Sequence, residues 1–236
     1  MGGQTPYFLI YLQKIIEKMP RIARVVTPNA PYHVTQRGNY KQNIFEGDED
    51  KQVYMDFFML YAKQYKVKLF AFCLMDNHVH FVVEPKKEDS LAMLFKYTHM
   101  RYSMYFNKKK GAHGHLFQGR FFSCVLDDEH LYEAIRYVEL NPLRANMVLN
   151  LEDYYWNSAY LRLTGNSAYK LDSIDNYFQI SDWKTYLQEP LDEEKIAQLR
   201  THTKTGRPLG NEKFIQKLEK KLGIKITIEK PGRKRK

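Results

Sequence analysis

Apolar residues recur along residues 30–142 with two different spacings, and the spacing changes where turn residues occur. Alternation in APYHVTQRG predicts a strand at residues 30–38 that ends in a turn. In residues 48–67, apolar positions recur at helical spacing behind an acidic start, which predicts a helix. The same criteria predict strands at 68–75, 78–85 and 120–126, and helices at 89–110 and 127–142.

The resulting order, β-α-β-β-α-β-α, predicts an α+β fold of the ferredoxin-like (RRM-like) type, with an antiparallel sheet and helices on one face. Beyond residue 148 the pattern weakens, and the chain is first irregular and aromatic, then acidic. Residues 203–210 have the composition of a linker. Residues 211–223 predict a short cationic helix, and KPGRKRK predicts a disordered end.

Positive charge is concentrated at the C-terminal end. Of a formal net charge of +10, residues 204–236 contribute twelve Lys and Arg against three acidic residues, whereas the remainder has 25 basic and 24 acidic residues. Such a tail, which includes Arg233, Lys234 and Arg235, is expected to add sequence-independent, salt-sensitive affinity for nucleic acid. A disordered end that only improves solubility is the alternative.

The two cysteines, Cys73 and Cys124, lie in apolar strand-like segments without C-x-x-C spacing. This excludes a disulfide scaffold and a cysteine-based zinc site, and it favours a reduced, cytoplasmic setting. The apolar patch at residues 8–12 is too short to cross a bilayer, which takes about 20 residues, so we expect no membrane partner. Residues 1–18 are interpreted as an N-terminal extension, with Met19 as an alternative start.

Two pairs of residues carry candidate chemistry. His78 and His80 are two apart in a predicted strand, so they share one face and could bind one metal ion; alternatively they are hydrogen-bonded or face solvent. Tyr137 and Asn141 are four apart, on one face of a predicted helix, and an Asn oxygen suits a hard cation. Tyr137 is one of 18 tyrosines, and a core position is the alternative. The other six histidines are interpreted as structural or surface residues, with His115 the one to check for proximity to the site.

Several of these segments together resemble a known family. DNHVHFVVEP, then HLFQGRFFSCVLDDEHLYEAIRYVELNPLRANMV and YYWNSAY, are similar in order and spacing to the single-tyrosine HUH transposases, in particular the REP-associated tyrosine transposases (REP, repetitive extragenic palindrome). The resemblance implies that His78 and His80 are metal ligands, that Asn141 completes the set, and that Tyr137 is the nucleophile. In the family the completing residue is Gln in some branches and Asn in others.

The resemblance also implies a function and a division of the chain. The protein would nick and join single-stranded DNA that contains a hairpin, through a 5′-phosphotyrosine, with Mg²⁺ or Mn²⁺, in the bacterial cytoplasm near the nucleoid, as a monomer or a homodimer. Residues 19–165 would form the transposase domain, 166–203 an acidic irregular or helical segment, and 204–236 the basic tail.

Mixed aromatic and basic residues suggest where DNA would be contacted, and two other functions stay open. The candidate contacts are Arg37, Gln118, Arg120, Lys108, Lys109 and Lys110. One alternative is a non-catalytic RRM-like nucleic-acid-binding protein, because the same element order builds RNA-recognition modules. The other is a metal-dependent hydrolase that uses the two histidines without a covalent step, for which Tyr137 would be dispensable.

Overall fold

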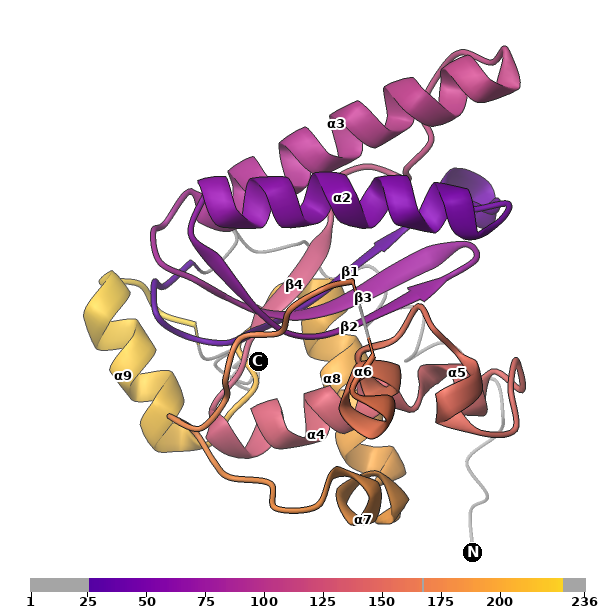
Figure 1. The fold of residues 1–236 in the computed structure, drawn as a ribbon. Helices are drawn as coiled ribbons and strands as arrows, with labels where there is room; N and C mark the ends of the chain where they lie inside the picture. Colours follow the sequence, from indigo (N-terminus) through magenta and orange to yellow (C-terminus); the bar gives the residue numbers. More distant parts are fainter. Residues whose placement is uncertain (1–25, 167, 227–236) are drawn as a thin grey trace, which may run out of the picture.

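The computed structural model describes residues 26–166 and 168–226, and its centre is a four-stranded antiparallel sheet (Figure 1). The strands are β1 (Tyr32–Arg37), β2 (Val67–Met75), β3 (His78–Pro85) and β4 (Phe122–Val125), in the spatial order β2-β3-β1-β4. Helix α2 (Asp48–Gln64) joins β1 to β2, and α3 (Ser90–Lys110) joins β3 to β4. This is the predicted ferredoxin-like arrangement, with each predicted strand and helix of the unit present.

One face of the sheet is covered by α2 and α3, which lie side by side above it in Figure 1. Phe81 of β3 is fully buried there, and its ring stacks on Phe58 of α2 with centroids 4.1 Å apart. Phe95 of α3 completes this aromatic cluster, with its ring centroid 5.9 Å from that of Phe81. Aromatic pairs of this kind add to the free energy that burial of their apolar area supplies. The two helices of the unit therefore lie on one face, as predicted.

The opposite face, which carries His78 and His80, is covered by later parts of the chain. Helix α4 (Asp128–Glu139) packs on β1, β2 and β3, and α8 (Glu193–Thr205) packs on β4 and β1. Figure 1 shows both below the sheet, away from α2 and α3. The remaining elements are η1 (Asn39–Lys41), α5 (Asn141–Arg144), η2 (Leu151–Asp153), α6 (Ser158–Thr164), α7 (Trp183–Gln188) and α9 (Glu212–Leu222).

The helix predicted at residues 127–142 is shorter than expected. α4 ends at Glu139, and Asn141 begins the separate short helix α5 with Pro142 in its first turn. Proline has no N–H and so cannot donate to the carbonyl of Val138. The Asn141 side chain donates instead, to the Tyr137 carbonyl at 2.8 Å and to that of Val138 at 3.4 Å. Asn141 therefore still lies about one turn beyond Tyr137, although not in the same helix.

The segment predicted as a linker, residues 203–210, is packed against the sheet instead. Thr203 is 2% exposed within α8, and Leu209 is 4% exposed. The Leu209 N–H donates to the Val125 carbonyl at 2.9 Å, so the backbone here extends the edge of β4. α9 then forms where the short cationic helix was expected.

Two further expectations concern the ends of the chain and the absence of a membrane-spanning helix. The N-terminal extension at residues 1–18 and the basic residues Arg233, Lys234 and Arg235 lie outside the described residues. Within residues 26–166 and 168–226, no helix is long and apolar enough to cross a membrane.

Candidate active site

The histidines of β3 lie in the middle of the sheet face under α4 and α8. In the strand register, His80 is opposite Thr35 of β1 and Cys73 of β2, and His78 is opposite Arg37 and Met75. Side chains at paired positions of adjacent strands project to the same face, so this face also carries His33, two positions before Thr35. The predicted shared face of His78 and His80 is thereby extended to a third imidazole.

The His80 ring is held by a chain of contacts that ends in α8. Its Nδ1 lies 3.0 Å from Nε2 of His33, and Nδ1 of His33 lies 2.7 Å from the Thr203 hydroxyl. That hydroxyl is also 3.2 Å from the Cys124 sulfur. Both hydrogen bonds form if Nδ1 of His80 donates to Nε2 of His33 and Nδ1 of His33 donates to the Thr203 hydroxyl. Nε2 of His80 then keeps a free lone pair. A metal-binding His80 requires this tautomer.

The His78 ring is oriented by its neighbour in the β2–β3 turn. Nδ1 of His78 lies 2.6 Å from Oδ1 of Asn77, an acceptor, so Nδ1 carries the proton and Nε2 is the free nitrogen. Burial, followed by the charge of Arg37, lowers the pKa of His78 to about 4. Burial also lowers the pKa of His33 to about 3 and that of His80 well below its usual value. All three imidazoles are therefore neutral at pH 7, the state in which a histidine binds a metal ion.

Tyr137 of α4 lies directly over these imidazoles. Its ring meets that of His80 edge to face with centroids 5.5 Å apart, and that of His33 at 5.8 Å. The phenol oxygen accepts a hydrogen bond from Nε of Arg200 in α8 at 3.2 Å. Tyr137 is only 4% exposed and belongs to the buried core, but it also borders a cavity.

That cavity, about 540 Å³ in volume, brings most of the predicted site residues together. Tyr137, His78, His80 and Asn141 all line it, and Asn141 turns its amide nitrogen to the α4 carbonyls. The Oδ1 atom of Asn141 has no hydrogen-bond partner within the described part of the chain. Other lining residues are His33, Thr35, Arg37, Gln118, Arg144, Arg200, Thr203 and Lys204.

Comparison with known proteins places part of the chain in a family. Residues 26–141 match the model of the family described as "Transposase IS200 like". These residues, just under half of the chain, belong to the IS200-like transposase family. The match ends at Asn141, so it spans the sheet, α4 and every residue of the predicted ligand and nucleophile set, but not α8.

Solved structures similar to this IS200-like transposase include a REP-associated tyrosine transposase bound to a REP hairpin. The TM-score is 0.50 at 14% sequence identity, covering 69% of this chain and 96% of that one. A candidate transposase from Deinococcus radiodurans R1 has a TM-score of 0.36 at 17% identity, covering 54% of this chain and 92% of the other. No curated protein matches the chain in sequence. The first likeness supports the fold described above.

The donor atoms of the candidate site suit a divalent ion by their chemistry. No group of three or more His, Cys, Asp or Glu suited to a metal occurs within residues 26–166 and 168–226. The candidate set is of a different kind, because it combines two neutral imidazole nitrogens with one amide oxygen. Within the described residues, Nε2 of His78, Nε2 of His80 and Oδ1 of Asn141 have no hydrogen-bond partner, so none of the three donor atoms is already engaged.

The predicted DNA contacts fall into two groups. Arg37 and Gln118 line the site cavity. Arg120 and His115 instead border another hollow, between α3 and residues 114–120. At the end of α3, Lys109 pairs with Asp50 at 2.6 Å and Lys110 pairs with Glu46, so their charges are partly neutralised. Lys108 sits beside them, and none of the three lysines lines the site cavity.

The residues missed by sequence reasoning come mainly from α8. Arg200, Thr203 and Lys204 line the cavity, yet they belong to a segment that the sequence marks only as acidic and irregular or as a linker. Arg144, one turn beyond Asn141, places its guanidinium carbon 5.9 Å from the centre of the Tyr137 ring. Alternation in APYHVTQRG puts His33 on the same strand face as Arg37, which was the available signal for His33.

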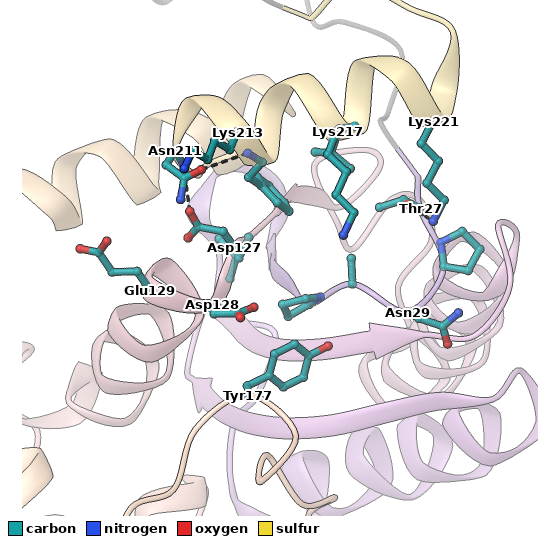
Figure 2. Close-up of a pocket in the computed structure, with 16 residues that line it drawn as sticks. Thr27, Asn29, Asp127, Asp128, Glu129, Tyr177, Asn211, Lys213, Lys217 and Lys221 are labelled. Carbon is teal, nitrogen blue, oxygen red and sulfur yellow. Dashed lines mark hydrogen bonds between the residues drawn. The ribbon is translucent and has the colours of Figure 1, made fainter.

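A second groove lies at the opposite end of β1, under α9. About 450 Å³ in volume, it is bordered by residues 27–31, the start of α4 and Tyr177. Figure 2 shows Lys213, Lys217 and Lys221 along the lower side of α9, above the groove. Lys221 donates to the Thr27 hydroxyl at 2.7 Å, whereas Lys213 and Lys217 have no hydrogen-bond or ion-pair partner in the described part of the chain. Part of the basic extension is thus an ordered helix.

Proposed function

We propose that this transposase cuts and rejoins single-stranded DNA that contains a hairpin, by covalent catalysis at Tyr137. The observation that carries the proposal is the position of the Tyr137 ring, 5.5 Å from the His80 ring at a cavity that Asn141 and His78 also line. A buried tyrosine that served only as core packing would have no need of a cavity bordered by four cationic side chains. Those cations are Arg37, Arg144, Arg200 and Lys204.

The proposed chemistry is a phosphoryl transfer to the phenol oxygen. The Tyr137 oxygen attacks the phosphorus of a phosphodiester and loses its proton, the P–O3′ bond breaks, and the departing oxygen takes up a proton as a 3′-hydroxyl. The other product is a strand joined to Tyr137 through its 5′-phosphate. Because one phosphoester replaces another, a 3′-hydroxyl can reverse the reaction and join strands without ATP.

His78, His80 and Asn141 would hold a divalent cation, Mg²⁺ or Mn²⁺, through two imidazole nitrogens and an amide oxygen. The bound ion would supply a Lewis acid that polarises the scissile phosphate and holds it in line for attack.

The protein's own cations would stabilise the charges of the reaction. Arg200 reaches the phenol oxygen at 3.2 Å, so its guanidinium is placed to stabilise negative charge there as the proton leaves. Arg144 approaches the Tyr137 ring from another side, and a bidentate ion pair with Glu193 holds its guanidinium, with the closer contact at 2.8 Å. Arg37 is available for the phosphates of the incoming strand.

The proposed substrate is a hairpin with single-stranded flanks, such as a REP-like palindrome. The similar REP-associated transposase was solved with a REP hairpin. Lys213 and Lys217 of α9 would add sequence-independent contacts to phosphates. The protein would act as a monomer or a homodimer on DNA in the bacterial cytoplasm.

The test is to incubate the protein with end-labelled hairpin DNA and Mn²⁺ and then run a denaturing gel. We expect a cleaved strand and a protein–DNA adduct with the wild type, and neither with Tyr137→Phe. Tyr132→Phe is the matched control, because Tyr132 lies on the same helix but hydrogen-bonds Glu189 outside the site. If Tyr137→Phe still cleaves, the covalent mechanism is wrong.

The same assay separates the two alternatives. A hydrolase without a covalent step would cleave with Tyr137→Phe but lose activity with His78→Ala. A non-catalytic RRM-like binder would cleave with no variant and would bind DNA equally well with His78→Ala. His113→Ala, at an exposed position, controls for loss of a histidine as such.

A further inference from the structure

Tyr40 presents a complete aromatic ring to solvent. It is 94% exposed and makes no ring contact or hydrogen bond through its side chain within the described residues. A single exposed apolar side chain is common at protein surfaces and needs no explanation by itself. The backbone that carries this one, however, is unusual.

Tyr40 and Lys41 both adopt left-handed conformations, with φ of 49° and 61°. For residues with a Cβ this conformation is unfavourable, and two in succession are rare; glycine or asparagine would be the less strained choice. Such conformations persist only where the surrounding structure imposes them, and they concentrate at binding and catalytic sites. The chain therefore holds an aromatic ring in solvent against its local backbone preference.

The loop is held rigidly on two sides. The Gly38 N–H donates to the Asn77 carbonyl at 2.9 Å, and the Asn39 N–H donates to the Leu116 carbonyl at 2.8 Å. Any side chain at Gly38 is excluded, because a Cβ there would lie 2.2 Å from the Gln42 carbonyl oxygen. Because the backbone that carries the ring is held in this way, it would lose little conformational freedom when the ring binds a flat ligand.

The loop also adjoins the candidate metal site. The Asn77 side chain accepts from His78 through Oδ1 and donates to the Lys41 carbonyl at 3.3 Å through its amide nitrogen. Arg37, which lines the site cavity, immediately precedes Gly38. Through the Lys41–Asn77–His78 contacts, the loop that carries Tyr40 is connected to the candidate metal site. Tyr40 also has a cation on either side of it in the chain, Arg37 and Lys41.

We propose that Tyr40 is a stacking platform for an unpaired base of the DNA strand that enters the site, with Arg37 and Lys41 contacting the adjacent phosphates. An exposed aromatic ring flanked by cations is the combination with which proteins bind single-stranded nucleic acid, because every base offers a flat face. The inference rests on the proposed function, since it takes single-stranded DNA as the substrate. It adds a base-binding position outside the ligand and nucleophile set.

The experiment measures binding in EDTA, by fluorescence anisotropy, of a hairpin with a single-stranded oligo(dT) flank. Tyr40→Gly relieves the backbone strain and removes the ring, so any loss of affinity comes from the ring and not from misfolding. We expect the dissociation constant to rise about tenfold, and Tyr40→Trp to keep affinity within about twofold of the wild type. Leu149→Gly is the matched control, at a side chain that is 93% exposed elsewhere on the surface.

An abasic scan of the flank identifies the stacked base. In the wild type, one abasic position should weaken binding about as much as Tyr40→Gly does, and in Tyr40→Gly the same position should cause little further loss. The stacking proposal is wrong if the abasic position and Tyr40→Gly weaken binding additively, or if Tyr40→Gly binds with wild-type affinity. Neither result would contradict the proposed cleavage by Tyr137. If the wild type itself does not bind the flanked hairpin above a duplex of equal length, the proposed substrate is wrong and the platform falls with it.

Discussion

Nε of Arg200 lies 3.2 Å from the hydroxyl oxygen of Tyr137 and donates a hydrogen bond to it. The two residues are 63 positions apart, on α8 and α4, and α8 lies outside the residues that match the transposase family. The candidate nucleophile therefore receives its hydrogen bond from a part of the chain that the family resemblance does not cover.

Replacing Arg200 should slow strand cleavage. Arg200→Ala removes the donor to the phenol oxygen, and loss of one such preorganised donor lowers a rate by about 10²-fold. Arg200→Lys should recover only part of the rate, because an ammonium ion cannot reproduce the planar guanidinium. Single-turnover cleavage with labelled hairpin DNA measures this. Arg101→Ala, at an exposed position of α3, should cleave at the wild-type rate; equal rates for Arg200→Ala and wild type would contradict the prediction.

Removing the hydroxyl of Thr203 should weaken metal binding although it changes none of the proposed metal ligands. Thr203→Val is close to isosteric and deletes the acceptor 2.7 Å from His33, so His33 and in turn His80 lose their fixed orientation. Loss of such an outer partner lowers metal affinity by about 10- to 100-fold. Calorimetric titration with Mn²⁺ gives the affinity directly. Thr201→Val, the same change at an exposed position of the same helix, should leave it unchanged.

Stability should fall as the pH is lowered, partly through His99. Burial lowers the pKa of His99 from 6.5 to about 3. Between these values the unfolded chain takes up a proton that the folded chain does not, so the free energy of unfolding decreases with falling pH by up to about 1.4 kcal/mol per pH unit. Urea unfolding from pH 7 to 4.5 should show a shallower decrease in His99→Gln. His113→Gln, at an exposed site, should follow the wild type.

The buried carboxylate of Glu139 should be needed for folding. Glu139 is fully buried at the end of α4, and it accepts from the Ser158 hydroxyl at 2.6 Å and from Nε of Arg162 at 2.8 Å. Glu139→Ala leaves the largely buried guanidinium of Arg162 without its counter-charge, which should lower the free energy of unfolding by about 3–5 kcal/mol. Urea denaturation checks this. Glu129→Ala, on the same helix but at an exposed position, should change it by less than about 1 kcal/mol.

The lysines of α9 should contribute salt-sensitive affinity. Lys213→Gln with Lys217→Gln removes two charges that have no ion-pair partner in the described part of the chain. If both contact phosphates, the slope of log K against log[salt] for single-stranded DNA should become shallower by about 1.4. The control pair Lys63→Gln with Lys96→Gln lies on α2 and α3, across the sheet, and should leave the slope unchanged.

Much of the sheet and its first two helices was predictable, because their apolar positions recur regularly. In HVHFVV the alternation puts His78 and His80 on one face, and the structure has them there. The end of α4 was predicted too late, because a proline three residues beyond the end of a helix can equally well be read as its last residue. The side chain of Asn141, which replaces the missing backbone donor, decided this.

The contribution of α8 could not be predicted, for two physical reasons. Its buried residues are Ile196, Leu199, Thr203 and Thr205, among charged and polar residues, which gives a weak apolar pattern. Its contacts to His33 and Tyr137 also depend on how β1 and β3 pair, and strand register over such separations is set by the packed structure. His33 shows the same limit: its strand face was predictable, but its partner was not.

Because α4 packs on the sheet of its own chain, each polypeptide brings one phenol to one pair of imidazoles. In the proposed chemistry, this sets a stoichiometry of one attached strand per molecule. After one cleavage, the strand attached to Tyr137 must be transferred to a 3′-hydroxyl before Tyr137 can cleave again. Excising a segment with two ends would then take either two molecules acting together or two successive rounds by one.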